Sequence, residues 1–383
     1  MTLPLKLSHI AAGTAAVIVG YSSAVVLVME TARAAGASPE QIISWLVMLG
    51  LGMGVTCIGL SWFFKMPVVT AWSTPGAAFL IANVQDYTLS ETIGACVIAG
   101  LMAMLTMQFK TCVKMLESIP HSLATAMLAG ILMPFCVAVF AQAEAQLVYL
   151  VIFFIVYLVT SYLIPRYTML VLLMLALGLA FFGGSFNQLE WQAPTLTWMA
   201  PSWSLQSTLA LSVPLYLVTM LSQNLPGIAI LHSHNYRPSS RIAISVPSAL
   251  QTVTAPLGGF TFNLAAITAA LCMGKEAGDD PSKRYWAGIC AGVGYLLLGV
   301  FGGSVVSLFE HIPHYLTVFL AGFALLPTLQ ANVLAMMQKE EHRFGALLTF
   351  LCCASGISLF GIGAAIWGLL LGTIFIVVNS RKR

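Results

Sequence analysis

Apolar runs of membrane-spanning length follow one another along this 383-residue chain from end to end. Of its residues 59% are hydrophobic and only 8% are charged, and the mean hydropathy is +0.92. A soluble protein of this length needs far more charge to cover its surface. Because lipid leaves unpaired backbone groups without partners, runs of about 20 apolar residues form helices there. The sequence therefore predicts an all-α membrane protein with many spans.

The breaks between the runs, at charged residues and at Gly, Pro and Asn, predict fourteen spans. Seven lie in the first half, at residues 9–31, 41–63, 68–84, 90–109, 121–140, 147–164 and 167–183. Seven lie in the second half, at residues 206–230, 241–255, 257–273, 285–308, 313–337, 344–358 and 360–379. No signal-peptide cleavage site follows the first run, so we expect it to remain as a span.

The distribution of positive charge indicates how these spans are oriented. With fourteen spans and a cytoplasmic N-terminus, all Lys and Arg residues except Arg33 fall on the cytoplasmic side, as the positive-inside rule requires. The long connection from Gly184 to Gln206 then lies outside, and its tryptophans suit the headgroup region (Trp191, Trp198 and Trp203). We therefore expect a multi-pass protein of the inner, cytoplasmic membrane with both termini in the cytoplasm.

A short sequence repeat relates the two halves of the chain. Residues 119–123 (IPHSL), followed by LAG at 128–130, recur as residues 312–316 (IPHYL), followed by LAG at 320–322. The offset is 314 − 121 = 193 residues, about half the chain. Because each half has an odd number of spans, the copies would cross the membrane in opposite directions, as an inverted repeat. The alternative is chance similarity between helices rich in Leu, Ala and Gly.

Two of the predicted spans are interrupted at matching places, at residues 70–76 (TAWSTPG) and 255–263 (APLGGFTFN). Non-helical backbone at membrane depth is stable only where protein or water surrounds it, and paired breaks commonly mark a transporter's binding site. In the first break we expect extended chain over residues 68–72, an N-cap at Ser73 and a half-helix to Asn83. In the second we expect extended chain over residues 260–262, an N-cap at Asn263 and a half-helix over 264–272.

Two facing helix starts would together offer about one positive charge and several free N–H groups, without any lysine or arginine. Such a site prefers an anion. Polar residues at mid-span in corresponding helices, and aromatic rings inside the second break, could complete it. The alternatives are that Pro75 and the Gly258–Gly259 pair only kink continuous helices, that the polar residues only join neighbouring helices, and that the aromatic rings face lipid.

Several kinds of chemistry find no support in the sequence. The acidic residues and the histidines lie in loops or near span ends, and Glu30 is the most deeply embedded acidic residue. No buried proton relay is therefore evident. The eight cysteines show no metal-ligand spacing, and no nucleotide-binding loop or nucleophile motif occurs. The basic residues, net charge +3, are scattered rather than gathered into a nucleic-acid-binding patch. We expect no enzyme activity, no metal and no cofactor.

Four motifs in order resemble the benzoate/proton symporter family, BenE. They are residues 70–78 (TAWSTPGAA), 119–123 (IPHSL), 222–227 (SQNLPG) and 263–270 (NLAAITAA), and the resemblance covers essentially the whole chain. That family is similar to the uracil-permease and sulfate-permease superfamily. The resemblance implies fourteen spans in two inverted repeats of seven, with spans 3 and 10 each a short strand plus a half-helix.

The resemblance also implies two domains that slide past each other like an elevator. The core domain would comprise residues 1–109 and 206–309, and the gate domain residues 110–205 and 310–383. Relatives with this fold often form homodimers through the gate domain. In relatives that transport nucleobases, acidic residues on spans 8 and 10 hold the base. Here the matching positions are the neutral Gln223 or Asn224 and Asn263, which suit a carboxylate better.

Our hypothesis is a secondary transporter that imports benzoate or a similar aromatic carboxylate with a proton. The proton would be carried by Glu30 or by the substrate's own carboxyl group, whose ordinary pKa is about 4. A nucleobase or inorganic-anion transporter of the same fold, an anion channel and a membrane protein that transports nothing are the alternatives. The predicted substrate-binding residues are Tyr21, Ser22, Ser23, Ser73, Thr74, Pro75, Gly76, Gln223, Asn224, Phe260, Thr261, Phe262 and Asn263.

Overall fold

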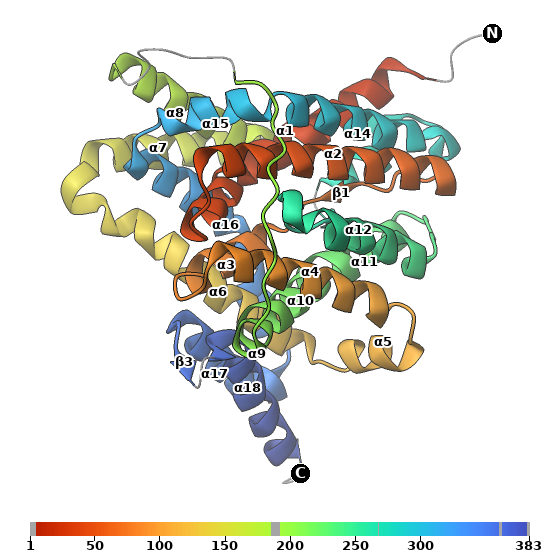
Figure 1. Ribbon diagram of the computed structural model, residues 1–383, viewed down its shortest axis with the longest axis vertical. Helices are drawn as coiled ribbons and strands as arrows, with labels where there is room; N and C mark the ends of the chain where they lie inside the picture. The colour runs from red at the N-terminus through yellow and green to blue at the C-terminus, as the bar shows by residue number, and fades with distance from the viewer. Residues whose placement is uncertain (1–4, 185–191, 267, 360–361, 381–383) are drawn as a thin grey trace.

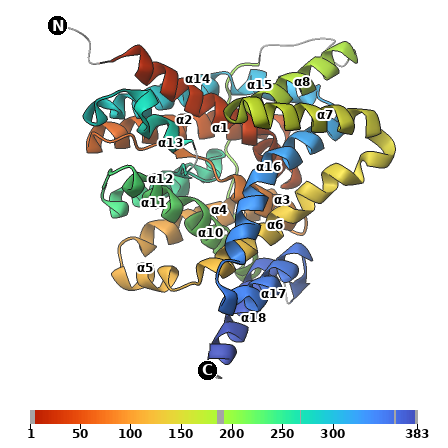
Figure 2. The same ribbon diagram turned by 180° about the vertical axis from the view of Figure 1, so that it is seen from behind.

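The computed structural model describes residues 5–184, 192–266, 268–359 and 362–380. Its helices pack side by side as a bundle, with the first and the last helix at opposite ends of the view (Figures 1 and 2). Within the described residues, eight helices are long and apolar enough to cross a membrane, or nine if one bent pair counts as a single span. This confirms a mostly helical membrane protein. The count of fourteen spans stays a prediction.

The first half of the chain follows the predicted spans closely. Its elements are α1 (Leu7–Ala34), α2 (Pro39–Phe64), β1 (Thr70–Ala71), α3 (Thr74–Asn83), α4 (Leu89–Thr106), α5 (Lys110–Glu117), α6 (His121–Ala141), α7 (Ala143–Leu163) and α8 (Thr168–Phe182). Local signals set several starts: Ser38 caps α2 just before Pro39, and Thr88 caps α4. The short polar helix α5 was not predicted and connects α4 to α6.

The second half begins with one long helical segment that changes its winding twice. α9 (Leu205–Ser207), α10 (Val213–Thr219) and α11 (Leu225–Ser233) are joined by two wider π-helical turns, Thr208–Ser212 and Met220–Asn224. The remaining elements of the second half are α12 (Ser240–Thr254), β2 (Asn263–Leu264), α13 (Ala269–Met273), α14 (Tyr285–Val300), α15 (Gly302–Glu310), α16 (His314–Met336), α17 (Arg343–Ala354), β3 (Ser358–Leu359), β4 (Ile362–Gly363) and α18 (Ala364–Ser380). α14 and α15 form the pair bent by 61°.

Two groups of helices can be distinguished by their packing. α2 packs on α14 and α4 on α12, whereas α6 packs on both α16 and α17, and α17 on α18. Small residues allow the closest contacts: a Cβ atom added to Gly50 of α2 would lie 2.4 Å from the Cα atom of Gly299 on α14. Such backbone contact is how helices gain packing energy in lipid, where the hydrophobic effect between them is weak.

An extended strap, residues 192–204, crosses the bundle from the α15 side to α9 (Figure 1). Backbone N–H groups fasten it at three points: Thr197 N donates to Ser44 Oγ at 2.9 Å, Met199 N to Pro256 O at 2.7 Å and Ser202 N to Ser90 O at 2.9 Å. Trp198 is 64% exposed, as a residue at a headgroup layer would be. The predicted interfacial position of the strap stays a prediction, and Trp191 lies outside the described residues.

Candidate functional site

The two interrupted segments meet in the middle of the bundle, where β1 and β2 form a two-stranded antiparallel ladder. Thr70 lies opposite Leu264 and Ala71 opposite Asn263, and Ala265 N extends the ladder to Val69 O at 2.9 Å. The pairing satisfies backbone groups that lipid could not. A strand is therefore confirmed inside the predicted extended segment 68–72, whereas the strand of the second break lies at residues 263–264, just after the predicted segment 260–262. The sequence analysis did not predict that the two segments pair with each other.

The first break has the geometry predicted for it. Ser73 caps α3: its hydroxyl accepts a hydrogen bond from Gly76 N at 3.0 Å, and Pro75 occupies the first turn. The N–H of Ser73 donates to the hydroxyl of Thr261 at 3.0 Å, which ties the two breaks together. Among the first three residues of α3, Pro75 has no N–H and the N–H of Gly76 is used by the cap. The N–H of Thr74 has no partner among the described residues, so it is the one donor left for a ligand. Fewer backbone donors are available here than we expected.

The second break differs from the prediction. Asn263 is not an N-cap: it lies in β2, and the next helix, α13, begins only at Ala269 and has five residues. The cause is that Asn263 is already engaged, since its backbone belongs to the ladder and its Oδ1 accepts from Asn224 Nδ2 at 3.1 Å. So short a helix also develops little end charge. The expected helix start at Asn263 is therefore wrong: within the described residues the second helix begins at Ala269, five residues later than predicted.

Alternation along the second break separates its side chains onto two faces. Phe260 and Phe262 face α2: the ring of Phe260 stacks on Trp45 with centroids 5.7 Å apart, and a Cβ atom added to Gly52 would lie 2.1 Å from the ring of Phe262. The two phenylalanines are 1% and 0% exposed. The rings we expected to stack on the ligand are therefore packed into the scaffold.

The opposite face carries Thr261 and Asn263, and Asn224 is bound to it. Asn224 lies at the end of a π-helical turn, a feature that is frequent at functional sites. Its Nδ2 donates to Asn263 Oδ1, and its Oδ1 accepts from Leu264 N at 3.1 Å. Asn263 Nδ2 is buried without any partner. Buried amide donors are rarely left so, because an unmade hydrogen bond costs about 1 to 3 kcal/mol. Neighbouring Gln223 is half-buried.

A second buried donor lies beside the start of α3. The ring of Tyr21, on α1, packs against that of Trp72 with centroids 5.1 Å apart, and its hydroxyl has no partner. The neighbouring serines are different, since Ser22 and Ser23 donate to carbonyls of their own helix, at 3.4 and 3.0 Å. Tyr21 and Asn263 thus each bring an unpaired donor close to the junction of β1 and α3.

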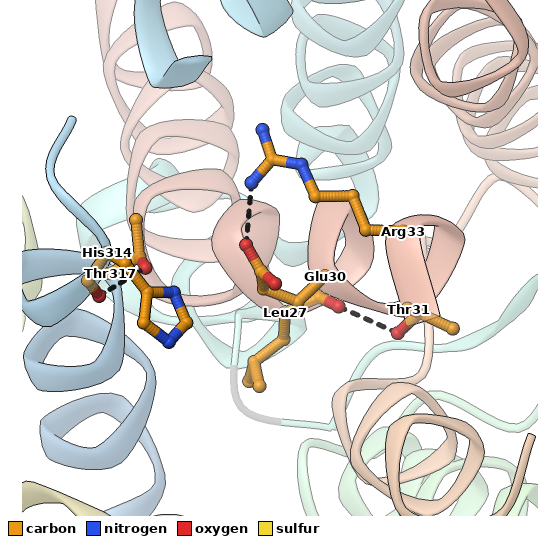
Figure 3. A network of polar contacts seen from close by, with 6 residues as sticks. All are labelled: Leu27, Glu30, Thr31, Arg33, His314 and Thr317. Carbon is orange, nitrogen blue, oxygen red and sulfur yellow. Dashed lines mark hydrogen bonds and ion pairs between the residues drawn. The ribbon is translucent and has the colours of Figure 1, made fainter. Parts of the chain in front are cut away.

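Glu30 lies away from this junction, nine residues or about 13 Å further along α1 than Tyr21. Its carboxylate accepts a hydrogen bond from Arg33 Nη1 at 2.6 Å (Figure 3). It lines a separate cavity between α1 and α16. Across the described residues, no cluster of three or more His, Cys, Asp or Glu could hold a metal ion.

A bundle of apolar helices around two paired, interrupted segments is the architecture of a membrane transporter. The transmembrane domain of the cyanobacterial bicarbonate transporter BicA matches 98% of this chain and 97% of its own, with a TM-score of 0.53 and 12% identity. Murine solute carrier 26 family member A9, an anion transporter in the inward-facing state, matches 98% of this chain and 68% of its own, with a TM-score of 0.60 and 13% identity. These likenesses show the fold.

Sequence comparison defines the family. The family model described as benzoate membrane transport protein, BenE, matches residues 4–378. The benzoate membrane transport protein of Acinetobacter baylyi is 38% identical over 98% of this chain and 96% of its own. The inner membrane protein YdcO of Escherichia coli is 36% identical over 96% of this chain and 95% of its own. The chain belongs to the benzoate membrane transport protein family, which confirms the resemblance, and it is a membrane transporter.

Proposed function

We propose that this protein imports benzoate or a similar aromatic carboxylate through the inner membrane, together with a proton. The observation that carries the proposal is a set of unpaired donors at one junction: the Tyr21 hydroxyl, Asn263 Nδ2 and the Thr74 N–H. A site with several free donors suits a ligand that only accepts, and an ionised carboxylate is such a ligand. The start of α3 adds a favourable dipole.

The aromatic side chains at this junction favour an aromatic ligand. Trp72 and Tyr21 already pack ring to ring beside it, and an aromatic ring added to such a pair gains about 0.5 to 1.5 kcal/mol beyond its burial. A nucleobase presents donors as well as acceptors, so it would need acceptors here. The amide oxygens of Asn224 and Asn263 are occupied by hydrogen bonds within the protein. The site therefore suits benzoate better than a base.

The packing of the helices supports two equivalent halves, which an odd number of spans in each would invert relative to one another. If α1 to α4 correspond to the segments α9–α11, α12, β2–α13 and α14–α15, the contact of α2 with α14 corresponds to that of α12 with α4. Likewise α1 with α3 corresponds to α11 with α13, and α17 with α18 corresponds to α7 with α8. We propose fourteen spans, with spans 3 and 10 broken, and termini in the cytoplasm.

Transport would proceed as an elevator-like slide of a core domain, residues 1–109 and 206–309, against a gate domain, residues 110–205 and 310–383. Several elements of the two units touch: α1 contacts α8 and α16, α6 contacts α3 and the turn Met220–Asn224, and β4 contacts the turn Thr208–Ser212. The strap, residues 192–204, is bonded to the core domain and would move with it. Arg166 of the gate domain pairs with Glu276 of the core domain at 2.7 Å. The Arg166 guanidinium lowers the pKa of the Glu276 carboxyl. Both side chains are substantially exposed, so the pair contributes little and does not prevent sliding. A homodimer would form through contacts between the gate domains of two copies of the chain.

Uptake into proteoliposomes tests the substrate. Labelled benzoate should enter with saturation, and unlabelled benzoate should compete strongly while uracil and sulfate do not. If only uracil or only sulfate competes, the substrate is a nucleobase or an inorganic anion and not benzoate. Large currents without saturable uptake would indicate a channel. The Asn263→Asp variant, reconstituted at equal density, is the matched control for specific uptake.

Coupling is tested by imposing a pH gradient across the same vesicles. An external pH lower than the internal pH should accelerate benzoate accumulation, and a protonophore should abolish the acceleration. The external pH should stay near 7, well above the ordinary carboxyl pKa of about 4, so that little neutral acid crosses the lipid unaided. Equal uptake with and without the gradient would remove the proton from the proposal.

A further inference from the structure

A cavity of about 150 Å³ lies between α1 and α3 on one side and α6 and α16 on the other. Its walls are mostly apolar, but Glu30 of α1 and His314 at the start of α16 both line it. Figure 3 shows the two side chains reaching toward the same space from different helices. In the proposed division, α1 and α3 belong to the core domain and α6 and α16 to the gate domain. The cavity therefore lies in the interface that would slide.

Both ionisable groups retain unused bonding capacity. One carboxylate oxygen of Glu30 accepts from Arg33, and the other has no bond to a described residue. The imidazole of His314 also has no hydrogen-bond partner among the described residues, although its backbone carbonyl accepts from the Thr317 hydroxyl at 2.7 Å. His314 is exposed, and in the predicted topology it lies at the outer end of α16, where external water is available.

Among the described residues, Glu30 and His314 are the ionisable groups that line this mostly apolar cavity. Arg33 is the one further charged side chain that reaches its rim within the described chain, through its bond to Glu30. Glu310 and His311 precede His314 in sequence but do not line the space, and His311 is bonded to a carbonyl of its own helix. Glu144, at the start of α7, is exposed and also lies outside it. The response of the cavity to pH therefore depends on Glu30 and His314.

We propose that Glu30 and His314 form an external proton-binding site that closes the outer rim between the core and gate domains. The proposal rests on the two-domain part of the proposed function, and the nature of the carried carboxylate does not affect it. In the predicted topology α1 ends, and α16 begins, on the outer side, so the proton comes from external water. It binds to the imidazole nitrogen and returns to external water when the pH rises.

The chemistry of the two groups explains why protonation would close the rim. Histidine is the side chain that ordinarily changes its charge between pH 5 and 8. Once protonated, both ring nitrogens donate, and one can form a charge-assisted hydrogen bond to the free oxygen of Glu30. Neutral imidazole gives no such charge pair. Because the surrounding walls are apolar, a pair of opposite charges is accommodated there better than either charge alone. External acid thus favours the closed rim.

Thiol labelling can follow the closure directly. Ala138, on α6, lines the cavity, whereas Ala141 at the end of the same helix is exposed and lies outside it. In full-length protein reconstituted in vesicles, Ala138→Cys and Ala141→Cys variants would be labelled with a membrane-impermeant thiol reagent, and the labelled site identified by mass spectrometry. The result is expressed as the ratio of the labelling rate at position 138 to the labelling rate at position 141. In this ratio the effect of pH on thiol reactivity, which is common to both positions, cancels.

We expect this ratio to fall about threefold or more when the external pH drops from about 7.5 to about 5.5. Adding either Glu30→Gln or His314→Gln should make the ratio independent of pH. His121→Gln is the matched control, because His121 starts α6 as His314 starts α16 but does not line the cavity, and it should preserve the fall. A flat ratio in the parent protein, or an unchanged fall in His314→Gln, would overturn the site.

The labelling needs no substrate, so its outcome is separable from that of the uptake experiments. Saturable benzoate uptake combined with a flat ratio rejects the proton site and leaves the proposed function standing. A fall that depends on His314, in a protein that carries another anion, supports the site and rejects benzoate.

Discussion

Each of the two interrupted segments contains a short strand followed by a helix, but different interactions stabilise the interrupted backbone in each. The first ends in a capped helix of ten residues, α3, whose start is fixed by Ser73 and Pro75. The second contains β2, and the next helix, α13, has only five residues. It is held instead by aromatic packing on α2 and by the amide of Asn224. One break therefore provides a dipole, and the other provides side-chain groups.

This asymmetry changes how anion binding should be understood. Two opposed helix starts would give a site whose affinity depends mostly on backbone. A single helix start, with one of its N–H groups used in capping, leaves a larger share to Tyr21 and Asn263. Side-chain donors can be removed one at a time by substitution, so the division between scaffold and ligand-binding groups can be tested.

The largest effect on stability should come from Phe262→Ala, which removes a fully buried ring from beneath the second break. Such a change typically costs about 3 to 5 kcal/mol of stability. We expect a large fall in the thermal unfolding midpoint of detergent-purified protein. Phe301→Ala is the control, because that ring is 50% exposed, and it should shift the midpoint little. Weakened benzoate binding at unchanged stability would mean that Phe262 faces the ligand after all.

The next largest effect should be on affinity, in Asn263→Asp. A carboxylate in place of the unpaired amide removes a donor and repels an anionic ligand, so we expect benzoate to bind about 10- to 100-fold more weakly by calorimetry. Asn263→Ala removes the amide donor without adding charge and should lose less. Equal affinities for the parent protein and Asn263→Asp would remove Asn263 from the site and leave α3 as the main determinant.

The first break was predictable from sequence because its signals are local. Ser73 followed by Pro75 is an N-cap pattern, and the cap depends on residues within one turn. The same reasoning failed at Asn263, since an asparagine also suits a cap in isolation. What decides its conformation is a ladder with residue 71 and a bond to residue 224, both far away in sequence. Local patterns cannot reveal such partners.

The roles of the phenylalanines could have been read more fully. The alternation of Phe260, Thr261 and Phe262 is typical of a strand with two different faces. It indicated that the rings and the hydroxyl point in opposite directions, but not which face meets α2. Gly52, the small residue that makes room for Phe262, is far away in sequence. The cavity lined by Glu30 and His314 was likewise not predictable, because it forms only where two distant helices pack.

A smaller effect is expected at the cap of the first break. Ser73→Ala removes the hydroxyl that accepts from Gly76 N and should cost about 1 kcal/mol of stability, seen as a modest fall in the unfolding midpoint. Ser73→Thr retains a capping hydroxyl and should restore most of it. If alanine at this position costs nothing, α3 begins elsewhere, and the two breaks are more alike than their geometry suggests.

The smallest expected effect, in Tyr21→Phe, separates binding from folding most clearly. The Tyr21 hydroxyl is buried without a partner, so its removal should leave stability unchanged or slightly higher. If the hydroxyl donates to the carboxylate, the same substitution should weaken benzoate binding by about fivefold, or about 1 kcal/mol. Affinity would then fall while stability does not. A purely structural role for Tyr21 predicts instead that stability falls.

Tyr216→Phe gives the opposite pattern and is therefore the matched control. Its hydroxyl already bonds to Thr106 at 2.7 Å, so the loss should reduce the unfolding midpoint and leave affinity unchanged. Thermal unfolding and calorimetric titration of both variants give four values that must fall in this crossed pattern. If Tyr21→Phe instead lowers stability and spares affinity, the hydroxyl serves the fold, and the ligand's donors lie on the second break alone.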